Sequence, residues 1–512
     1  MSVLVLVREG CYQDSARLMQ VSRELAALPG VADAVAMMGT GTNRRLLAEA
    51  GFEGEALDRA TPLDMVVALR AAHDAALDVA KGALDRLLAP SRGGGAGTAA
   101  AGRPASVVEA LDAHPRANLV SVAVPGPYAA FVAHRALDAG RSVFLFSDNV
   151  PLEDEVALKR RAAGLGLLVM GPDCGTAILS GTGLGFANRV ARGPVGIVGA
   201  SGTGIQELSC LLDRLGVGIS HAIGTGSRDL SEAVGGAMTE AGLALLAADA
   251  GTRCVAVVAK HPAEGVALRL HGVLSRLGKP VVVRYLGDPP RPAADGVVYA
   301  SSLDEAAEIA AAWGRGEAAS RDEARATFRV RLAASPEPGE ARLVGLFGGG
   351  SLAAEARCVL AARGVETVVP RERLSRTAPF PPGHLVVDTG DDAYTVGRPH
   401  PMVDQTVRCD LVRAAGADPS VRVLLLDLVL GDGAHPDPAP EIVQAVDDAR
   451  GAGRGRPFVV VVSVCGTRRD PQGTARQVQL LGEAGIRVEP TSARSADAAA
   501  ALLLGVPAEV ER

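Results

Sequence analysis

The strongest chemical signal in the chain is a short, small-residue turn between an apolar run and an amphipathic segment. Residues 193–216 read GPVGIVGASGTGIQELSCLLDRLG, which predicts a buried strand, a turn and a helix. In such a unit the N–H groups of the turn and the positive helix end favour an anion beyond the carboxyl end of the strand. The candidate phosphate-binding residues are Ser201, Gly202, Thr203 and Gly204. Glycines that only allow close strand-to-helix packing are the structural alternative, and the lysine of a Walker loop is absent.

A second glycine turn follows the apolar run VRVLLLDLVL, at GDGAHPDPAPEIVQAV. Gly431 and Gly433 turn the chain, and the prolines favour a helix start soon afterwards. These two glycines are further candidates for phosphate binding. Asp432 would repel an anion, so a helix cap or a group that orients His435 is an equally good interpretation.

Three side chains could act on a substrate near these turns. The polar stretch VDTGDDAYTVGRPHPMVDQTVR contains Arg398 and His400, and His435 lies beside the second turn. A histidine can serve as acid, base or hydrogen-bond donor near neutral pH, and polar loops at strand ends often carry sites. Simple solvation of the loop is the alternative for each of them. Cys174 fits a small buried thiol better than a nucleophile.

The elements that must position these residues are alternating strands and helices. Short Val/Ile/Leu runs alternate with helical segments along nearly the whole chain, which predicts α/β architecture with parallel sheets. One domain is predicted for residues 1–190, with a mobile loop at 91–105 and strands that include 4–7, 34–38, 119–124, 142–146 and 167–170. A second domain is predicted for residues 191–316, a linker for 317–340 and a third domain for 341–512.

Composition excludes several classes of function. The net charge is −6 and no basic run is present, which argues against nucleic-acid binding. The 7 cysteines are scattered, so neither a disulfide framework nor a zinc site is expected. No charge-free apolar stretch is long enough to cross a membrane, and the amino terminus does not have the pattern of a signal peptide. We therefore expect a cytoplasmic protein with no metal.

Several segments resemble the α subunit of succinyl-CoA synthetase and its ATP-citrate lyase relatives. They are VPLEDEVALKRRAAGLGLLVMGPDCGTAI and GPVGIVGASGTGIQE, together with the shorter VPGPYAAF. VVDTGDDAY and the segment after residue 421 are similar to the carboxy-terminal ligase domain of the β subunit. The amino-terminal CYQDSARLMQVSRELAALPGVADAVAMMGTGTNRRLLAEAGF resembles the FdrA family, in which both halves share one chain. The resemblance implies a Rossmann-like, CoA-binding-type domain followed by two flavodoxin-like domains of the succinyl-CoA synthetase type.

The chain departs from the ligase pattern at the reacting group. The loop with the phosphorylated histidine should follow KPVVVRYLG, but DPPRPAADG stands there, and Lys260 lies near the position of the supporting glutamate. The chain has no ATP-grasp segment, and the first domain has no glycine-rich loop to approach the phosphates of CoA. Both anion-facing turns remain, so they could hold the phosphate of a free acyl phosphate.

The FdrA resemblance implies an oxamate carbamoyltransferase subunit, which moves a carbamoyl group between carbamoyl phosphate and oxamate in purine or allantoin catabolism. The leading hypothesis places phosphate between residues 201–204 and 431–433, in an oligomer with partner subunits. The first alternative is an acyl-CoA ligase subunit that binds CoA and receives its nucleotide domain from another chain. The second alternative is a non-catalytic scaffold subunit. No cofactor is predicted except CoA under the first alternative.

Overall fold

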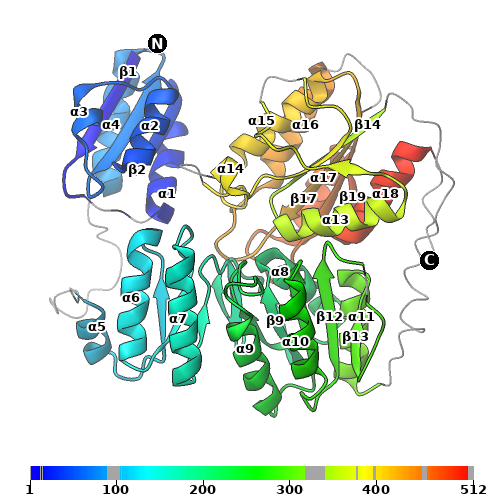
Figure 1. Ribbon diagram of the computed structural model, residues 1–512. Helices are drawn as coiled ribbons and strands as arrows, with labels where there is room; N and C mark the ends of the chain where they lie inside the picture. Colours follow the sequence, from blue (N-terminus) through cyan, green and yellow to red (C-terminus); the bar gives the residue numbers. More distant parts are fainter. Residues whose placement is uncertain are drawn as a thin grey trace. The chain divides into compact units, whose positions relative to one another are not determined.

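The computed structural model (Figure 1) describes residues 2–505, except 12, 14, 89–103, 105, 290, 318–340, 376–378, 396–398 and 453–457. The chain forms two compact units, Met1–Arg103 with Thr395–Pro399, and Pro104–Tyr394 with His400–Arg512. Almost all of the predicted loop at 91–105 and of the predicted linker at 317–340 lies outside the described residues.

The first unit has an antiparallel sheet of its own. Its elements are β1(Ser2–Arg8), α1(Ser15–Ala26), β2(Val31–Met38), α2(Gly41–Glu49), α3(Glu55–Arg59), β3(Met65–Ala71) and α4(Asp74–Leu88). The strand order is β1-β3-β2, and β3 pairs antiparallel with both neighbours. The prediction of one Rossmann-like domain over residues 1–190 is therefore wrong. It included the first two strands but not β3, an almost fully buried apolar run that completes a separate sheet and core.

The second unit begins with a small parallel sheet of order β4-β5-β6. Its elements are α5(Val107–Ala113), β4(Leu119–Val122), α6(Gly126–Asp138), β5(Ser142–Leu145), α7(Leu152–Leu165) and β6(Val169–Met170). This is the βα pattern expected of the Rossmann-like part. Each predicted strand in this region is present.

A seven-stranded sheet follows, with the order β13-β12-β11-β9-β10-β7-β8. Its strands are β7(Thr176–Leu179), β8(Thr182–Gly185), β9(Arg192–Ala200), β10(Ile219–Gly224), β11(Cys254–Lys260), β12(Val281–Leu286) and β13(Val297–Tyr299). Its helices are α8(Gly202–Arg214), α9(Ala237–Ala248), α10(Glu264–Leu274) and α11(Leu303–Arg315). Because the β7–β8 hairpin precedes residue 191 and pairs with β10, this sheet begins earlier in the chain than predicted.

The last sheet is parallel throughout, with the order β15-β16-β14-β17-β18-β19. Its strands are β14(Arg342–Phe347), β15(Thr367–Val368), β16(His384–Asp388), β17(Val421–Val429), β18(Val459–Cys465) and β19(Arg487–Glu489). The helices are α13(Gly350–Ala362), α14(Asp392–Thr395), α15(Thr406–Ala417), α16(Ala439–Ala452), α17(Thr474–Glu483) and α18(Ser492–Leu504). Strands covered on both faces explain the continuous apolar run of β17.

The two large sheets share one hydrophobic core. Ile205 and Leu208 of α8 belong to the same buried cluster as Leu352 and Ala356 of α13. A buried ion pair also joins the two layers, since Arg284 Nη2 lies 2.7 Å from Glu355 Oε2. These contacts fix the ends of α8 and α13 relative to each other. None of the described helices is long and apolar enough to cross a bilayer.

Candidate functional site

Two helices of the second unit begin side by side. α8 follows β9 and α13 follows β14, each directly after the carboxyl end of its strand. The Oγ atoms of Ser201 and Ser351 lie 2.5 Å apart. A Cβ on Gly349 would lie 2.9 Å from Thr203 Cγ2, so the two turns are in close contact. The positive ends of two helix dipoles therefore meet at one place, which an anion would stabilise.

The start of α8 holds its shape through Ser201. This residue is the N-cap, and its Oγ accepts a hydrogen bond from the Gly204 amide at 3.1 Å. A Cβ on Gly204 would lie 2.3 Å from that Oγ, so only glycine fits there. A Cβ on Gly202 would lie 3.6 Å from its nearest neighbour, Thr176 Oγ1. Among the described residues, the amides of Gly202 and Thr203 have no acceptor, which leaves two donors for a ligand.

The start of α13 is held by a buried carboxylate. Asp427 accepts hydrogen bonds from the amides of Gly348 and Gly349, at 2.7 and 2.8 Å. Arg408 Nη1 also donates to Asp427 Oδ1, at 2.6 Å, and both side chains are buried. Burial raises the pKa of Asp427 against the opposing effects of Arg408 and the two amides. This network fixes the turn, while the Gly350 and Ser351 amides have no acceptor in the described part of the chain.

Lys260 and Asp388 lie beside the start of α13. Lys260 ends β11 and Asp388 ends β16, and Lys260 Nζ is 3.9 Å from Asp388 Oδ2. A Cβ on Gly350 would lie 2.0 Å from that Oδ2 and 2.8 Å from Lys260 Nζ. Burial raises the pKa of Asp388, while the charge of Lys260 acts in the opposite direction. A cation and a carboxylate with a raised pKa thus lie next to the paired helix starts.

Asp173 is a further acidic group at a strand end, three residues after β6. Its side chain reaches solvent, but desolvation by the surrounding protein raises the pKa of Asp173 to about 6, although Ser227 donates a hydrogen bond to it. The charge of Asp148 also raises the pKa of Asp173, while the charge of Lys260 lowers it. A carboxyl group with this pKa can donate or accept a proton near neutral pH.

A buried charge cluster holds the small parallel sheet against the seven-stranded sheet. Lys159 Nζ donates to Glu155 Oε1 at 2.7 Å, to Asp229 Oδ1 at 2.9 Å and to the Thr225 carbonyl at 2.8 Å. Arg228 Nε lies 2.8 Å from the other oxygen of Glu155. Because Arg228 follows Ser227, the cluster also positions the group that contacts Asp173.

His400 lies beside this region. Its Nδ1 accepts a hydrogen bond from the Met402 amide at 3.2 Å, which leaves the proton of the neutral ring on Nε2. A Cβ on Gly390 would lie 2.6 Å from His400 Nε2, 3.0 Å from the Gly348 carbonyl and 3.1 Å from Asp388 Oδ1. Burial, together with the charge of Arg408, lowers the pKa of His400 to about 4. His400 is therefore a neutral donor near Asp388 and the turn before α13.

The other predicted turn has a different environment. α16 begins only at Ala439, so Gly431 and Gly433 do not stand at its N-terminus. The Gly431 amide donates to Gln472 Oε1 at 3.1 Å, and Asp432 forms an ion pair with Arg189 at 2.8 Å. The structure thus brings residues 201–204 into contact with residues 348–351. The segment before Gly431 meets α8 one turn further on, where Gln206 Nε2 donates to the Leu430 carbonyl at 3.4 Å.

The remaining predicted side chains fall in two places. His435 Nε2 lies 3.0 Å from Glu441 Oε1, and its Nδ1 accepts from the Asp437 amide at 3.1 Å. Both ring nitrogens of His435 therefore have partners within its own loop and helix. Arg398 lies outside the described residues.

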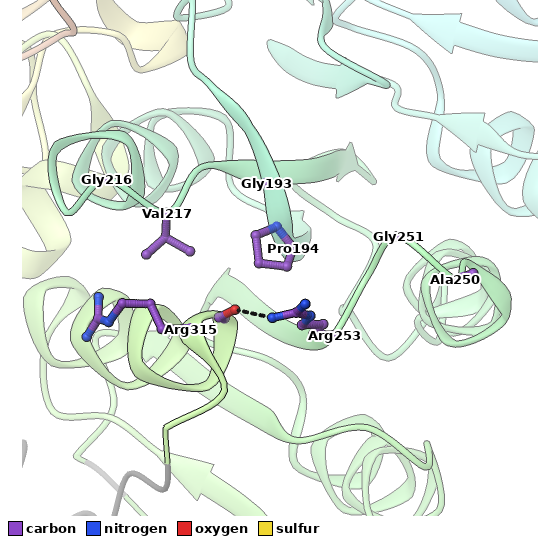
Figure 2. A pocket seen from close by; sticks show the side chains of 9 residues that line it. Gly193, Pro194, Gly216, Val217, Ala250, Gly251, Arg253 and Arg315 are labelled. Carbon is purple, nitrogen blue, oxygen red and sulfur yellow. Dashed lines mark hydrogen bonds between the residues drawn. The ribbon is translucent and has the colours of Figure 1, made fainter.

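A separate hollow of about 500 Å³ lies at the opposite ends of the strands (Figure 2). Gly193 and Pro194 at the start of β9 line it, together with Arg253, whose Nη1 donates to the Gly314 carbonyl at 3.1 Å. The start of α8 is at the other end of β9, so this hollow does not belong to the site. In parallel α/β sheets, ligands bind at the carboxyl ends of the strands.

Sequence reasoning missed three parts of the site. It assigned no role to the glycine turn at 348–351, to Asp388 or to Asp173. A usable signal was a pattern that two of these parts share with Lys260: Lys260, Asp388 and the 348–351 turn each end or directly follow a strand. Carboxyl ends of parallel strands meet at one edge of a sheet, which brings such residues together.

This α/β chain contains a CoA-ligase domain. Residues 346–502 match the family model described as CoA-ligase, and residues 1–104 match the model described as AllF, heavy metal-associated domain. YahF of Escherichia coli strain K12, an uncharacterized protein, is 35% identical over 509 residues, which is 96% of this chain and 97% of YahF. The chain therefore belongs to the FdrA family of acyl-CoA synthetase-like proteins.

Other known proteins match a smaller part of the chain or match it at lower sequence identity. Subunit alpha 2 of the ADP-forming succinate–CoA ligase of Archaeoglobus fulgidus is 35% identical over 114 residues, which is 22% of this chain and 40% of that subunit. A dinucleotide-forming acetyl-coenzyme A synthetase from Ca. Korarchaeum cryptofilum has a TM-score of 0.32 at 20% identity, and covers 75% of this chain and 82% of the synthetase.

The residues of the first unit do not fit a heavy-metal site. Cys11 is the one cysteine among residues 1–104. Across the described ranges, no group of three or more His, Cys, Asp or Glu side chains could hold a metal ion. Soft and borderline metals are held by several sulfur or nitrogen ligands, so the resemblance of this unit to a metal-associated domain concerns its fold.

Proposed function

We propose that the chain is an acyl-transfer subunit that binds an acyl phosphate, with the phosphoryl group at the paired starts of α8 and α13. The observation that carries the proposal is the contact between two helix starts whose amides at Gly202, Thr203, Gly350 and Ser351 have no acceptor among the described residues. Two adjacent positive helix ends attract a phosphate dianion more strongly than a neutral or singly charged group.

The reaction follows from the place where charge develops. An acceptor nucleophile attacks the acyl carbon, the bond from that carbon to the phosphate oxygen breaks, and the electron pair leaves with the phosphate. N–H groups fixed before the reaction stabilise that departing charge without having to reorganise. His400 Nε2 is proposed as the hydrogen-bond donor to the acyl oxygen, since the ring is neutral with its proton on Nε2. The proton released by the acceptor passes to a nearby carboxylate or to the phosphate.

A ready-made acyl phosphate suits this chain better than a phosphorylated histidine. No histidine occurs between β12 and β13, where the resembled ligases carry theirs. The site therefore has no side chain in that loop to receive a phosphoryl group from a nucleotide. An acyl phosphate brings both the acyl group and the leaving group in one molecule.

CoA is the acceptor that the family membership favours. Under this proposal the chain carries the acyl-transfer half of an acid–thiol ligase reaction, and a partner chain makes the acyl phosphate from an acid and a nucleotide. The thiol attacks from the side of the β4–β6 sheet, near Asp173. That carboxyl group, with its pKa of about 6, is suited to accept the thiol proton.

Carbamoyl transfer to oxamate is the second candidate. The loop without histidine favours it, because carbamoyl phosphate is itself an acyl phosphate and needs no phosphorylated enzyme. In this version the amide nitrogen of oxamate is the nucleophile, phosphate occupies the same helix starts, and partner subunits complete the enzyme. A non-catalytic scaffold role would leave the free amides at both helix starts without a use.

The test measures phosphate release with the purified full chain. One arm contains acetyl phosphate and CoA, the other carbamoyl phosphate and oxamate, and each is run with wild type and with Gly202→Val. Acceptor-dependent release in the first arm supports the CoA-linked reaction, and release in the second arm supports carbamoyl transfer. The thermal midpoint with each acyl phosphate is recorded in parallel, because a ligand that binds the native state raises it. Absence of both release and stabilisation would overturn the proposal.

A further inference from the structure

We propose that Lys260 binds the phosphoryl group of the ligand directly, and that its ion pair with Asp388 opens when phosphate binds. This inference rests on the proposed function and adds to it a residue that determines ligand charge. In this proposal the ligand replaces Asp388 as the anion that contacts Lys260.

The position of Lys260 follows from the register of two neighbouring strands. β11 pairs parallel with β9, and Ala259 is aligned with Ala200. The next residue on each strand is Lys260 and Ser201, so the lysine stands beside the N-cap of α8. On its other side, a Cβ on Gly350 would lie 2.8 Å from Lys260 Nζ. The ammonium group thus lies next to the starts of both helices.

Lys260 is weakly engaged within the protein. Its single ion pair in the described part of the chain is the 3.9 Å contact with Asp388, and no hydrogen bond from its ammonium is found there. The side chain is 47% exposed, so it can move toward a ligand. Asp388, by contrast, is anchored, because its Oδ1 accepts from the Gly390 amide at 2.9 Å.

The chain uses lysine rarely, and each described lysine outside the site has a clear structural role. Only 4 of its 52 basic residues are lysines. Lys159 lies in the buried charge cluster, Lys279 donates to two carbonyls at the end of α9, and Lys81 pairs with Asp78 on the surface. Lys260 has no such role. A compact ammonium suits a single anion between two helix ends, where a planar guanidinium would need more room.

Asp388 occupies the place of an anion at the start of α13. A Cβ on Gly350, the first residue of that helix, would lie 2.0 Å from Asp388 Oδ2. A carboxylate there stabilises the helix end when no ligand is bound, but it repels a phosphate. The ligand therefore competes with Asp388 for Lys260, and removing the charge of either residue should have opposite effects on affinity.

The experiment measures the dissociation constant of inorganic phosphate for the full chain by titration calorimetry. We expect Lys260→Ala to weaken binding about tenfold or more, because a charge-assisted contact is lost. Asp388→Asn should tighten binding several-fold, and Lys81→Ala, a matched loss of one lysine charge in the first unit, should leave it unchanged. Lys260→Gln, which keeps most of the side chain, replaces the alanine variant if that variant unfolds.

The outcomes separate this inference from the proposed function. Equal phosphate affinity in wild type and Lys260→Ala, with binding lost in Gly202→Val, would overturn the role of Lys260 and leave the helix starts as the phosphate site. Weaker binding in Asp388→Asn would overturn its role as a competing anion. Absence of phosphate binding in wild type would overturn both the inference and the proposed site.

Discussion

The two glycine turns predicted to bind phosphate show how differently one sequence pattern can be used. Both follow a buried parallel strand. At 201–204 the helix begins at once, and the Gly202 and Thr203 amides have no acceptor among the described residues. At 431–433 five more residues precede Ala439, and the Gly431 and Asp432 amides donate to Gln472 Oε1 and to the Ala187 carbonyl. A turn is open to a ligand when its amides are left without internal partners.

The largest expected effect comes from closing the first turn. Gly202→Val should reduce turnover about 100-fold or more, since the branched side chain keeps phosphate away from the two amides. A Cβ at this position meets no atom closer than 3.6 Å, so the fold should survive. Gly202→Ala, with one methyl group, should have a smaller effect. Phosphate release by both variants at the wild-type rate would contradict a phosphate site at the first turn.

Gln472 tests the second turn. Its Oε1 accepts from the Gly431 amide, and its Nε2 donates to the Gly431 carbonyl at 2.7 Å. Gln472→Ala leaves these buried groups unpaired, which should lower the free energy of unfolding by about 2–3 kcal/mol. Urea denaturation measures this loss, and phosphate affinity should not change. Weaker phosphate binding at unchanged stability would show that the second turn is the ligand site.

The lowered pKa of His400, which lies near the turn before α13, predicts that stability depends on pH. Its folded pKa of about 4 lies below the ordinary histidine value of 6.5, so on acidification the unfolded chain gains the proton first. Stability is therefore present above about pH 6.5 and is lost as the pH falls toward 4. Relative to His400→Gln, wild type should lose about 1–2 kcal/mol between pH 7.5 and pH 5. Parallel stability curves for the two proteins would contradict a half-buried, neutral His400.

The smallest effect is expected at the edge of the second turn. Arg189 Nη2 lies 2.8 Å from Asp432 Oδ1, and both side chains are about half exposed. Asp432→Asn should cost less than about 1 kcal/mol of stability, because water and salt screen such pairs. The midpoint of urea unfolding measures it. An increase in phosphate affinity in this variant would indicate that Asp432 does face the ligand.

Alternation of apolar runs and helical segments was enough to predict the α/β class and most strands of the second unit. The same pattern does not report strand direction, so the antiparallel β3 and the separate first sheet were missed. Ser201 and Gly202 could be found because strand, turn and helix are contiguous. The contact of this turn with the turn at 348–351 could not be found from sequence, because Ser201 and Ser351 are 150 positions apart. Likewise, Gln472, which hydrogen-bonds to the backbone of Gly431, lies 41 residues further along the chain.

The central claim is that phosphate binds at the paired starts of α8 and α13. Amide hydrogen exchange, followed by mass spectrometry with and without saturating phosphate, tests it most directly because the ligand would use these amides. We predict slower exchange in peptides that contain Gly202, Thr203, Gly350 and Ser351, with no change in peptides around Gly431. Protection around Gly431, with none at the starts of α8 and α13, would contradict the account.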